Sequence, residues 1–172
     1  MKTLKDATKE NHEKAEKMPF NMRMFSGQLT EDQYLLHLVQ QLEIFKAIET
    51  KGLPSNALSR IEATQKDIDE LLAKGNASKT ILISTQNYVD YINTLTENDV
   101  LPHVYLNYLA LMFGGKIMKT KVPSTGKMYD FKHRKEAMLS VRTVQKDEWA
   151  DEVNRAYGYI IAILDELHKE TS

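Results

Sequence analysis

Apolar residues recur at helical spacing along most of the chain. Between Gln33 and Glu49 they fall three and four positions apart, which predicts an amphipathic helix over this stretch. Thr30 precedes it, and Gln33 follows three residues later, which is the spacing of a capping box. Gly27 and Gly52 are expected to end helices on either side. No segment alternates apolar and polar residues for long, so no strand is predicted.

The same periodicity predicts helices on both sides of this one. A polar helix is expected over 58–73, another over 78–95, and a third from Pro102, a residue suited to a first helical turn. Two more helices are expected over 132–141 and 146–167, after a loop at 122–127. We therefore expect an all-α fold, a single domain over residues 1–172 built as a bundle of about six to eight helices.

Composition and charge exclude several function classes. The net charge is −1, which argues against a general nucleic-acid binder. The chain has no cysteine, so disulfides, thiolate catalysis and cysteine metal sites are excluded. No apolar run approaches the ~18 residues of a membrane span. The opening Met1–Lys5 leads into polar sequence without a signal-peptide core, so we expect a cytoplasmic protein, as a monomer with no membrane partner.

The first candidate for chemistry is His12, near the start of the chain. Its neutral imidazole is a good axial ligand for heme iron. Lys5, Thr8, His12, Ala15 and Glu16 lie three or four residues apart and can share one helix face. Glu16, one turn after His12, could accept a hydrogen bond from the second ring nitrogen. An isolated histidine is more often a solvated helix residue, so this signal needs a second one.

The second candidate is the apolar run that starts at Tyr105 and ends in Gly114 and Gly115. Two adjacent glycines in a helix cost roughly 1–2 kcal/mol relative to alanine. Because glycine has no Cβ, it also lets backbone approach a flat ligand closely. We expect a kinked helix over a ligand, with a plain helix end as the alternative. The sequence shows no tight histidine metal spacing, phosphate-binding loop or catalytic triad.

The order of these segments resembles the heme oxygenase family, and in particular its compact bacterial and phage-type members. The opening Leu4–His12 resembles the family's proximal helix, whose histidine ligates heme iron. His103–Leu109 followed by Gly114-Gly115 resembles the start and kink of its distal helix, and Asp151–Tyr157 fits its last helix. The resemblance spans nearly the whole chain.

The resemblance implies a role for each matching residue. His12 would be the iron ligand, Glu16 its hydrogen-bonding partner, and Lys5 and Tyr105 contacts of the heme propionates. Gly114 and Gly115 would give backbone access above the iron. The full set implied to bind heme is His12, Glu16, Lys5, Thr8, Tyr105, Lys132 and Lys135.

One position departs from the family. The distal pattern usually reads Gly-Asp-Leu-Ser/Tyr-Gly-Gly, and here it reads Ala110-Leu111-Met112-Phe113-Gly114-Gly115. In the family the aspartate anchors a water network that delivers protons during oxygen activation, whereas the Leu111 side chain can neither accept nor relay one. Positioned proton transfer contributes ~10²–10⁴-fold to a rate. The expected consequence is peroxidase-like behaviour or stalled turnover.

Three functions stay open. The first, which we favour, is a heme oxygenase that uses O2 and electrons from ferredoxin or another reductase to open heme to biliverdin, iron and CO, with a bilin reductase as a further partner. The second is a heme-binding carrier, buffer or sensor without turnover. The third is the fold alone, with its pocket closed by Leu111, Met112 and Phe113. A diiron enzyme is excluded, since no set of inward Glu, Asp and His ligands can be assembled.

Overall fold

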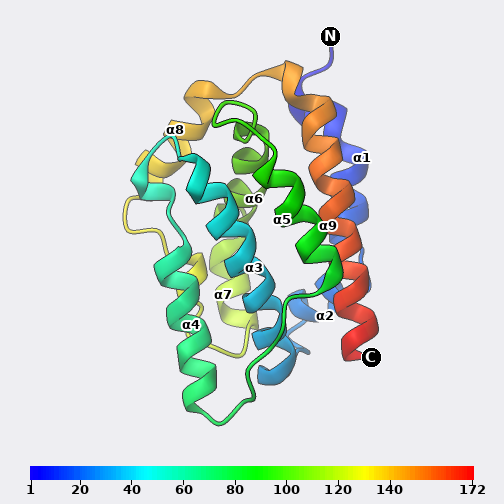
Figure 1. The fold of residues 1–172 in the computed structure, drawn as a ribbon, viewed down its shortest axis with the longest axis vertical. Helices are drawn as coiled ribbons and strands as arrows, with labels where there is room; N and C mark the ends of the chain where they lie inside the picture. Colours follow the sequence, from blue (N-terminus) through cyan, green and yellow to red (C-terminus); the bar gives the residue numbers. More distant parts are fainter.

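The computed structural model describes all 172 residues and contains only helices and loops (Figure 1). Its nine α-helices are α1 (Leu4–Glu16), α2 (Pro19–Phe25), α3 (Glu31–Lys51), α4 (Ile61–Ala73), α5 (Ile83–Asn93), α6 (Leu101–Met112), α7 (Gly115–Lys121), α8 (Arg134–Val144) and α9 (Ala150–Thr171). Three 3₁₀ turns connect them: η1 (Asn56–Leu58), η2 (Lys127–Tyr129) and η3 (Asp147–Trp149). None of the helices combines the length and apolar character needed to cross a bilayer.

The all-α prediction is confirmed, but the predicted helix count was too low. The helix stop expected at Gly27 is present, but no separate short helix α2 is predicted before it, and the apolar pattern predicts α6 and α7 as one helix. Helices α2 and α7 have only seven residues each, too few for a helical period to show. The helix predicted over 78–95 begins later, at Ile83, because the Gln40 side chain bonds Thr80 O (3.0 Å) and Leu82 N (2.9 Å) and holds this segment extended along α3.

The long helix α3 lies at the centre of the bundle, with α4 and α5 packed against it. Its start has the predicted capping box, in which Thr30 and Gln33 bond each other's backbone N–H groups. The hydrophobic core is one connected cluster that includes side chains from α1 to α6, α8 and α9. Tyr34, Phe45 and Tyr108 are among its largest fully buried members.

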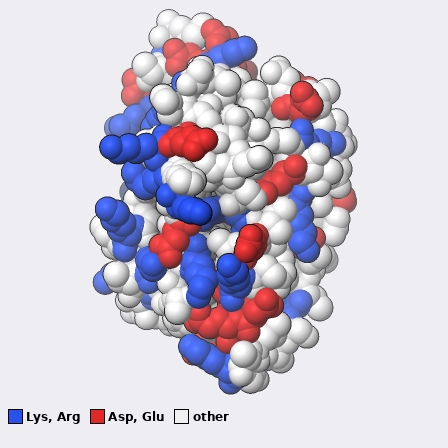
Figure 2. Space-filling view, turned by 90° about the vertical axis from the view of Figure 1, so that its left-hand side faces the viewer, with Lys and Arg blue, Asp and Glu red and all other residues white.

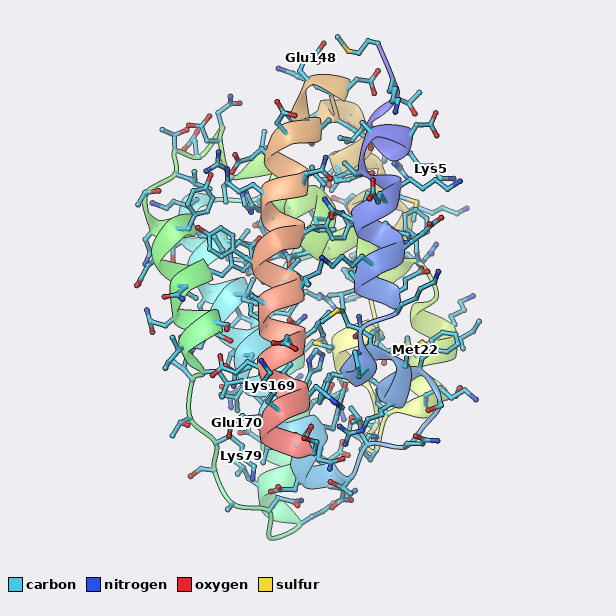
Figure 3. The ribbon with its side chains drawn as sticks, turned by 90° about the vertical axis from the view of Figure 1, so that its right-hand side faces the viewer. Lys5, Met22, Lys79, Glu148, Lys169 and Glu170 are labelled. Atoms are coloured by element: carbon cyan, nitrogen blue, oxygen red, sulfur yellow. The ribbon has the colours of Figure 1, made fainter.

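The first and last helices run side by side in the same direction (Figure 3). Asn11 Nδ2 on α1 donates to Asn154 Oδ1 on α9 (2.9 Å), and Asn154 Nδ2 donates to Ala7 O (3.2 Å). At the N-terminal end of the two helices, Leu4 N donates a hydrogen bond to Asp147 Oδ1 (2.9 Å). These bonds fix the register of α1 on α9.

At the two glycines the chain breaks between α6 and α7, where one kinked helix was favoured and a plain helix end was the alternative; we call this break the kink. Gly114 has φ +73°, in the left-handed region, and α7 restarts at Gly115. Arg134 Nη2 on α8 donates to Met112 O (2.9 Å), one of the carbonyls left without a helical partner at the end of α6. The chain therefore changes direction at Gly114 and continues as helix α7.

A polar network lies in the interior between α5, α6 and α9. His103 contacts the Tyr88 hydroxyl through Nδ1 (2.7 Å) and Glu152 Oε2 through Nε2 (2.8 Å). Burial lowers the pKa of the His103 imidazole despite the nearby carboxylate. Burial alone would raise the pKa of Glu152, but hydrogen bonds from Tyr91 and His103 outweigh it and hold that pKa below its usual value. The network joins three helices, of which α6 and α9 also carry residues of the candidate site described below.

His37 makes stability depend on pH. Its buried ring lies 5.7 Å from Phe20 and 5.9 Å from Tyr34, and Nδ1 has no hydrogen-bond partner. Burial lowers its pKa from 6.5 to about 4. Between these values the unfolded chain binds a proton that the folded chain does not, so stability is lost as pH falls through this window, by at most about 3 kcal/mol. In urea unfolding across that range, His37→Gln should flatten the pH dependence. The exposed control His133→Gln should keep the wild-type slope, and an unchanged slope in His37→Gln would contradict the assignment.

The two kink glycines should respond differently to alanine. At Gly114 nothing lies within 4 Å of an added Cβ, but the left-handed backbone costs an L-residue about 1–2 kcal/mol. At Gly115 the backbone is helical, and an added Cβ would lie 3.6 Å from Tyr129 Cδ1, an ordinary contact. Gly114→Ala should therefore lower the free energy of unfolding by about that amount, while Gly115→Ala changes it little. Denaturant unfolding of the two variants gives the comparison, and equal losses would be inconsistent with this backbone geometry.

Candidate functional site

His12 stands on the outer part of α1, with both ring nitrogens engaged. Nε2 lies 2.8 Å from Glu16 Oε1, and Nδ1 lies 3.1 Å from the Tyr157 hydroxyl. The His12 and Glu16 side chains are more than half exposed, at 56% and 64%. An exposed side-chain contact one helical turn apart is weak, worth about 0.3–0.5 kcal/mol. The Nε2 side of the ring is therefore easily opened to an incoming ligand.

Tyr157 approaches the other side of the His12 ring from α9. It is 7% exposed, and its ring meets the imidazole edge-on at 6.4 Å between centroids and 78° between planes. Burial raises the pKa of the Tyr157 phenol, and the neighbouring Tyr105 and Glu16 raise it further. The hydroxyl therefore keeps its proton at neutral pH and is an uncharged partner for His12.

From Tyr157 the site extends along α6 to the kink. Tyr105 is near enough to Tyr157 to influence its pKa, and its ring lies edge-on to Trp149 at 6.4 Å. Burial raises the pKa of Tyr105, and the nearby Arg142 of α8 opposes this rise. The Arg142 guanidinium in turn lies 5.5 Å from the centroid of Phe113, at the kink. Tyr157 thus contacts the imidazole on α1, and Arg142 lies beside the break between α6 and α7.

Apolar side chains are exposed at this break. Phe113 is 54% exposed and Ile117 is 53% exposed, and Ala110 is also exposed although α6 is otherwise largely buried. The space beside Gly114 is open, since a Cβ placed there would meet no atom within 4 Å. Contiguous exposed apolar surface of this kind commonly marks a ligand site. Together with an accessible imidazole and the cationic Arg142, it suits a flat apolar ligand that carries anionic groups.

The helix face predicted for α1 is split in the structure. Lys5 and Glu16 are exposed, and Lys5 points away from α9 in Figure 3. Thr8, predicted to share the ligand-binding face, is 4% exposed, and its hydroxyl donates to Leu4 O (2.9 Å). The structure brings His12, Glu16 and Tyr105 into one region but turns Thr8 into the core.

The two lysines predicted as further basic contacts lie at the start of α8. Lys132 lines a shallow surface pocket with Asn56 of η1 and with Arg60. Arg60 holds the preceding segment there, because its Nη1 donates to Met128 O (3.2 Å) and Asp130 O (2.6 Å). Lys132 therefore lies beside η1, and its contact with a ligand stays a prediction. Lys135 is exposed and has no ion-pair partner.

Sequence reasoning missed three residues of the site. Arg134 and Arg142, two turns apart on α8, brace the kink and approach Tyr105; their spacing on one helix was the available signal. Tyr157 was noted only as part of the last helix. Nothing local to residue 157 shows that its hydroxyl meets an imidazole 145 positions earlier.

The inner side of α6 around Leu111 is apolar or already hydrogen-bonded. Leu111 is 6% exposed and belongs to the hydrophobic core. Asn107 donates to the Tyr88 hydroxyl (3.0 Å) and to His103 O (2.9 Å), and the Tyr108 hydroxyl donates to Glu49 Oε2 (2.9 Å). Both polar side chains of this part of α6 are therefore committed to interior partners.

No group of three or more His, Asp or Glu side chains is placed to hold a metal ion. A diiron centre, which needs several such ligands, does not fit this arrangement. A single imidazole beside apolar surface fits an iron that arrives inside a macrocycle.

Comparison with known proteins gives the same picture. Heme oxygenase 2 of Rattus norvegicus is 27% identical over 98% of this chain, and the chain covers 65% of that protein's length. Among solved structures, the heme complex of heme oxygenase-1 from the cyanobacterium Synechocystis sp. PCC6803 superposes with a TM-score of 0.78 at 20% identity, covering 97% of this chain and 91% of that one. Heme oxygenase from Leptospira interrogans gives 0.79 at 19% identity, with 95% and 97% covered. At these identities the structural matches establish the fold.

The decisive match is to the family itself. The sequence model described as heme oxygenase matches residues 1–165, a span that contains His12, the kink glycines and Tyr157. With the shared fold, this match establishes that the chain belongs to the heme oxygenase family.

Proposed function

We propose that this chain binds heme through His12 and opens it to biliverdin, iron and CO, using O2 and electrons from a protein donor. The observation that carries the proposal is the accessible His12 imidazole, in contact with Tyr157, in a fold that also exposes an apolar kink beside Arg142. The chain spans 65% of the length of the first relative it matches. The activity of the whole relative is therefore a proposal for this chain.

The residues at the site match the parts of a heme molecule. Phe113, Ile117 and the open side of Gly114 offer apolar contact to the macrocycle. Arg142, Lys5 and the Tyr105 hydroxyl offer positive charge and a hydrogen-bond donor to the propionates. When bound, heme supplies the iron at which oxygen is activated. The protein's part is to hold the iron by His12, exclude water by its apolar surface and deliver protons.

Proton delivery is the weak part of this arrangement and supports a second candidate function. Leu111 is buried and apolar, and Asn107 is committed to interior partners. A heme-binding protein needs the ligand histidine and the apolar surface but no proton relay. A heme carrier, buffer or sensor is therefore the alternative, and the buried Leu111 is the observation that favours it.

Charge on the chain suits an acidic electron donor such as ferredoxin. Residues 114–146 carry nine Lys and Arg but two Asp and Glu, in a chain whose net charge is −1. Figure 2 shows Lys and Arg side chains, with Asp and Glu between them, on the side on which α4 and α8 lie in Figure 1. Complementary charge of this kind raises association rates and selects partners. We propose a ferredoxin-type protein or another reductase as donor, with a bilin reductase receiving the product.

The test is an aerobic absorption time course of the protein with one equivalent of hemin, before and after adding ferredoxin, its reductase and NADPH, in the presence of catalase. A sharp Soret band that decays into a biliverdin spectrum supports the oxygenase. A sharp band that persists supports the heme-binding alternative. Absence of a sharp band excludes both and leaves the fold alone.

Removing the imidazole should abolish the ligand-bound spectrum. His12→Ala deletes the proposed iron ligand at an exposed helix position where alanine is well tolerated, so the fold should survive. We expect loss of the sharp Soret band, measured by hemin titration, with the exposed control His133→Ala unchanged. A wild-type spectrum in His12→Ala would rule out this histidine as the ligand.

A further inference from the structure

We propose that Tyr88 is a one-electron oxidation site, with His103 as the base that takes its proton and Glu152 as the charge that stabilises the product. This role lies beyond the proposed function, since it concerns a buried network outside the candidate site and is present in the chain without a ligand. The network joins α5, α6 and α9, and Figure 1 shows α5 lying beside α9.

The hydrogen bonds of the network run in one direction. The Glu152 carboxylate can only accept, so His103 Nε2–H donates to its Oε2 (2.8 Å). Burial keeps the pKa of His103 below its usual value, so at neutral pH the ring is uncharged and Nδ1 carries a free lone pair. The Tyr88 hydroxyl, 2.7 Å away, therefore donates to Nδ1. The phenol proton thus already points at a base, and that base is held by a carboxylate.

This arrangement suits the loss of an electron from the phenol. An oxidised phenol is a far stronger acid than the phenol itself, and a base within hydrogen-bond reach can take its proton in the same step. One electron leaves Tyr88 for the oxidant, the O–H bond breaks, and the proton moves to His103 Nδ1. The products are a neutral phenoxyl radical at Tyr88 and an imidazolium at His103, next to the Glu152 carboxylate.

The charge balance favours this step in the protein interior. Before oxidation the ionised Glu152 gives the three residues a single negative charge, and afterwards the His103 imidazolium cancels it. Oxidation of an isolated buried phenol would instead create a positive charge without a counter-ion, which is costly in a medium of low dielectric constant. The Tyr88 oxygen also keeps its hydrogen bond from Asn107 Nδ2 (3.0 Å) and gains one from His103 Nδ1–H.

A stack of tyrosine rings connects this buried site to the surface. The Tyr159 ring of α9 lies 5.1 Å from the rings of both Tyr88 and Tyr91, with planes tilted by 14° and 24°. Tyr88 is fully buried, whereas Tyr91 and Tyr159 are partly exposed. A strong one-electron oxidant therefore need not reach Tyr88. It can take an electron from an outer ring, which then takes one from Tyr88 through the stack.

The radical should settle at Tyr88 because of its proton acceptor. The Tyr91 hydroxyl donates to the Glu152 carboxylate, whose pKa is held below its usual value by its hydrogen bonds despite burial. The acceptor of Tyr88 is an imidazole, which is intrinsically the stronger base. Burial also shields the Tyr88 ring from reductants in solvent.

One consequence for the candidate site rests on the proposed function. The buried Leu111 predicts peroxidase-like behaviour, in which hydrogen peroxide is reduced to water by two electrons. A bound heme can supply one of these electrons and Tyr88 the other, with the Tyr88 proton kept at His103. His103 of the network and Tyr105 of the site are two residues apart on α6. The network would then draw an oxidising equivalent away from the ligand.

The first test uses the full chain without heme. Photogenerated tris(bipyridine)ruthenium(III), with a cobalt(III) ammine as the sacrificial electron acceptor, serves as the oxidant, and tyrosyl radical is measured by electron paramagnetic resonance. Wild type should form a long-lived radical, and Tyr88→Phe should lose it while keeping the ring stack. Tyr34→Phe is the matched control and should keep the wild-type signal, because Tyr34 is also fully buried but its hydroxyl makes no hydrogen bond.

The second test asks whether His103 takes the proton. By transient absorption, His103→Gln should slow formation of the Tyr88 radical by ~10²-fold or more, the low end of what a positioned base contributes. Glu152→Gln changes only the charge of a partly exposed side chain, so it remains informative if His103→Gln folds poorly, and it should lower the radical yield. Formation in wild type should also be slower in heavy water, because a proton moves with the electron.

Four results would count against these assignments. The absence of a tyrosyl radical in wild type, or an equal signal in wild type and Tyr88→Phe, overturns the oxidation site. Wild-type rates and yields in both His103→Gln and Glu152→Gln overturn the role of the base. With hemin and hydrogen peroxide, a tyrosyl signal that persists in Tyr88→Phe overturns only the consequence for the candidate site. Failure of the proposed function is distinct, because it appears as an unchanged hemin spectrum in His12→Ala.

Discussion

The contact between the first and last helices is the interaction on which the site depends. It joins residues about 145 positions apart, and closing a loop of that length costs about 4 kcal/mol in chain entropy. The hydrogen bonds made by Asn154 contribute about 1 kcal/mol each and cannot offset that cost alone. Burial does so, since each apolar side chain removed from water contributes about 1.5–3 kcal/mol, and Leu4, Val153 and Tyr157 are buried on these two helices. The polar bonds then select one register, and that register puts His12 against Tyr157.

A second constraint fixes the other end of the site. The turn at Gly114 leaves carbonyls at the end of α6 without helical partners, and Arg134 binds one of them at Met112. The same helix α8 brings Arg142 to Phe113 and Tyr105. Helix α8 therefore holds the kink through Arg134 and places the Arg142 guanidinium beside the exposed Phe113. Helices α6 and α7 alone would not fix the distance between this positive charge and the apolar surface.

Local sequence signals identified most of the elements and the two ends of the site. The capping box at Thr30, the proline at the start of α6 and the glycine kink each follow from chemistry within a few residues, and all are present in the structure. Short helices such as α2 were missed because seven residues do not establish a period. The places of Thr8, Lys132 and Tyr157 depend on contacts with distant elements: Thr8 faces the core, Lys132 follows a segment held by Arg60, and Tyr157 meets His12 only after α1 docks on α9. Spacing along the chain carries no information about such contacts.

The same geometry provides groups that could hold a ligand but few polar groups that could supply it with protons. Around the histidine the structure provides an accessible Nε2 and a firmly held Nδ1, so ligand binding is well prepared. Around the kink it provides apolar contact and a cation. On the inner side of α6, Leu111 is packed in the core, and Asn107 and Tyr108 bond His103, Tyr88 and Glu49. Freeing either polar side chain would leave buried groups unpaired, at a cost of about 1–3 kcal/mol each. The space beside Gly114 is open, so solvent is nearer to the outer side of the kink than to these buried polar groups.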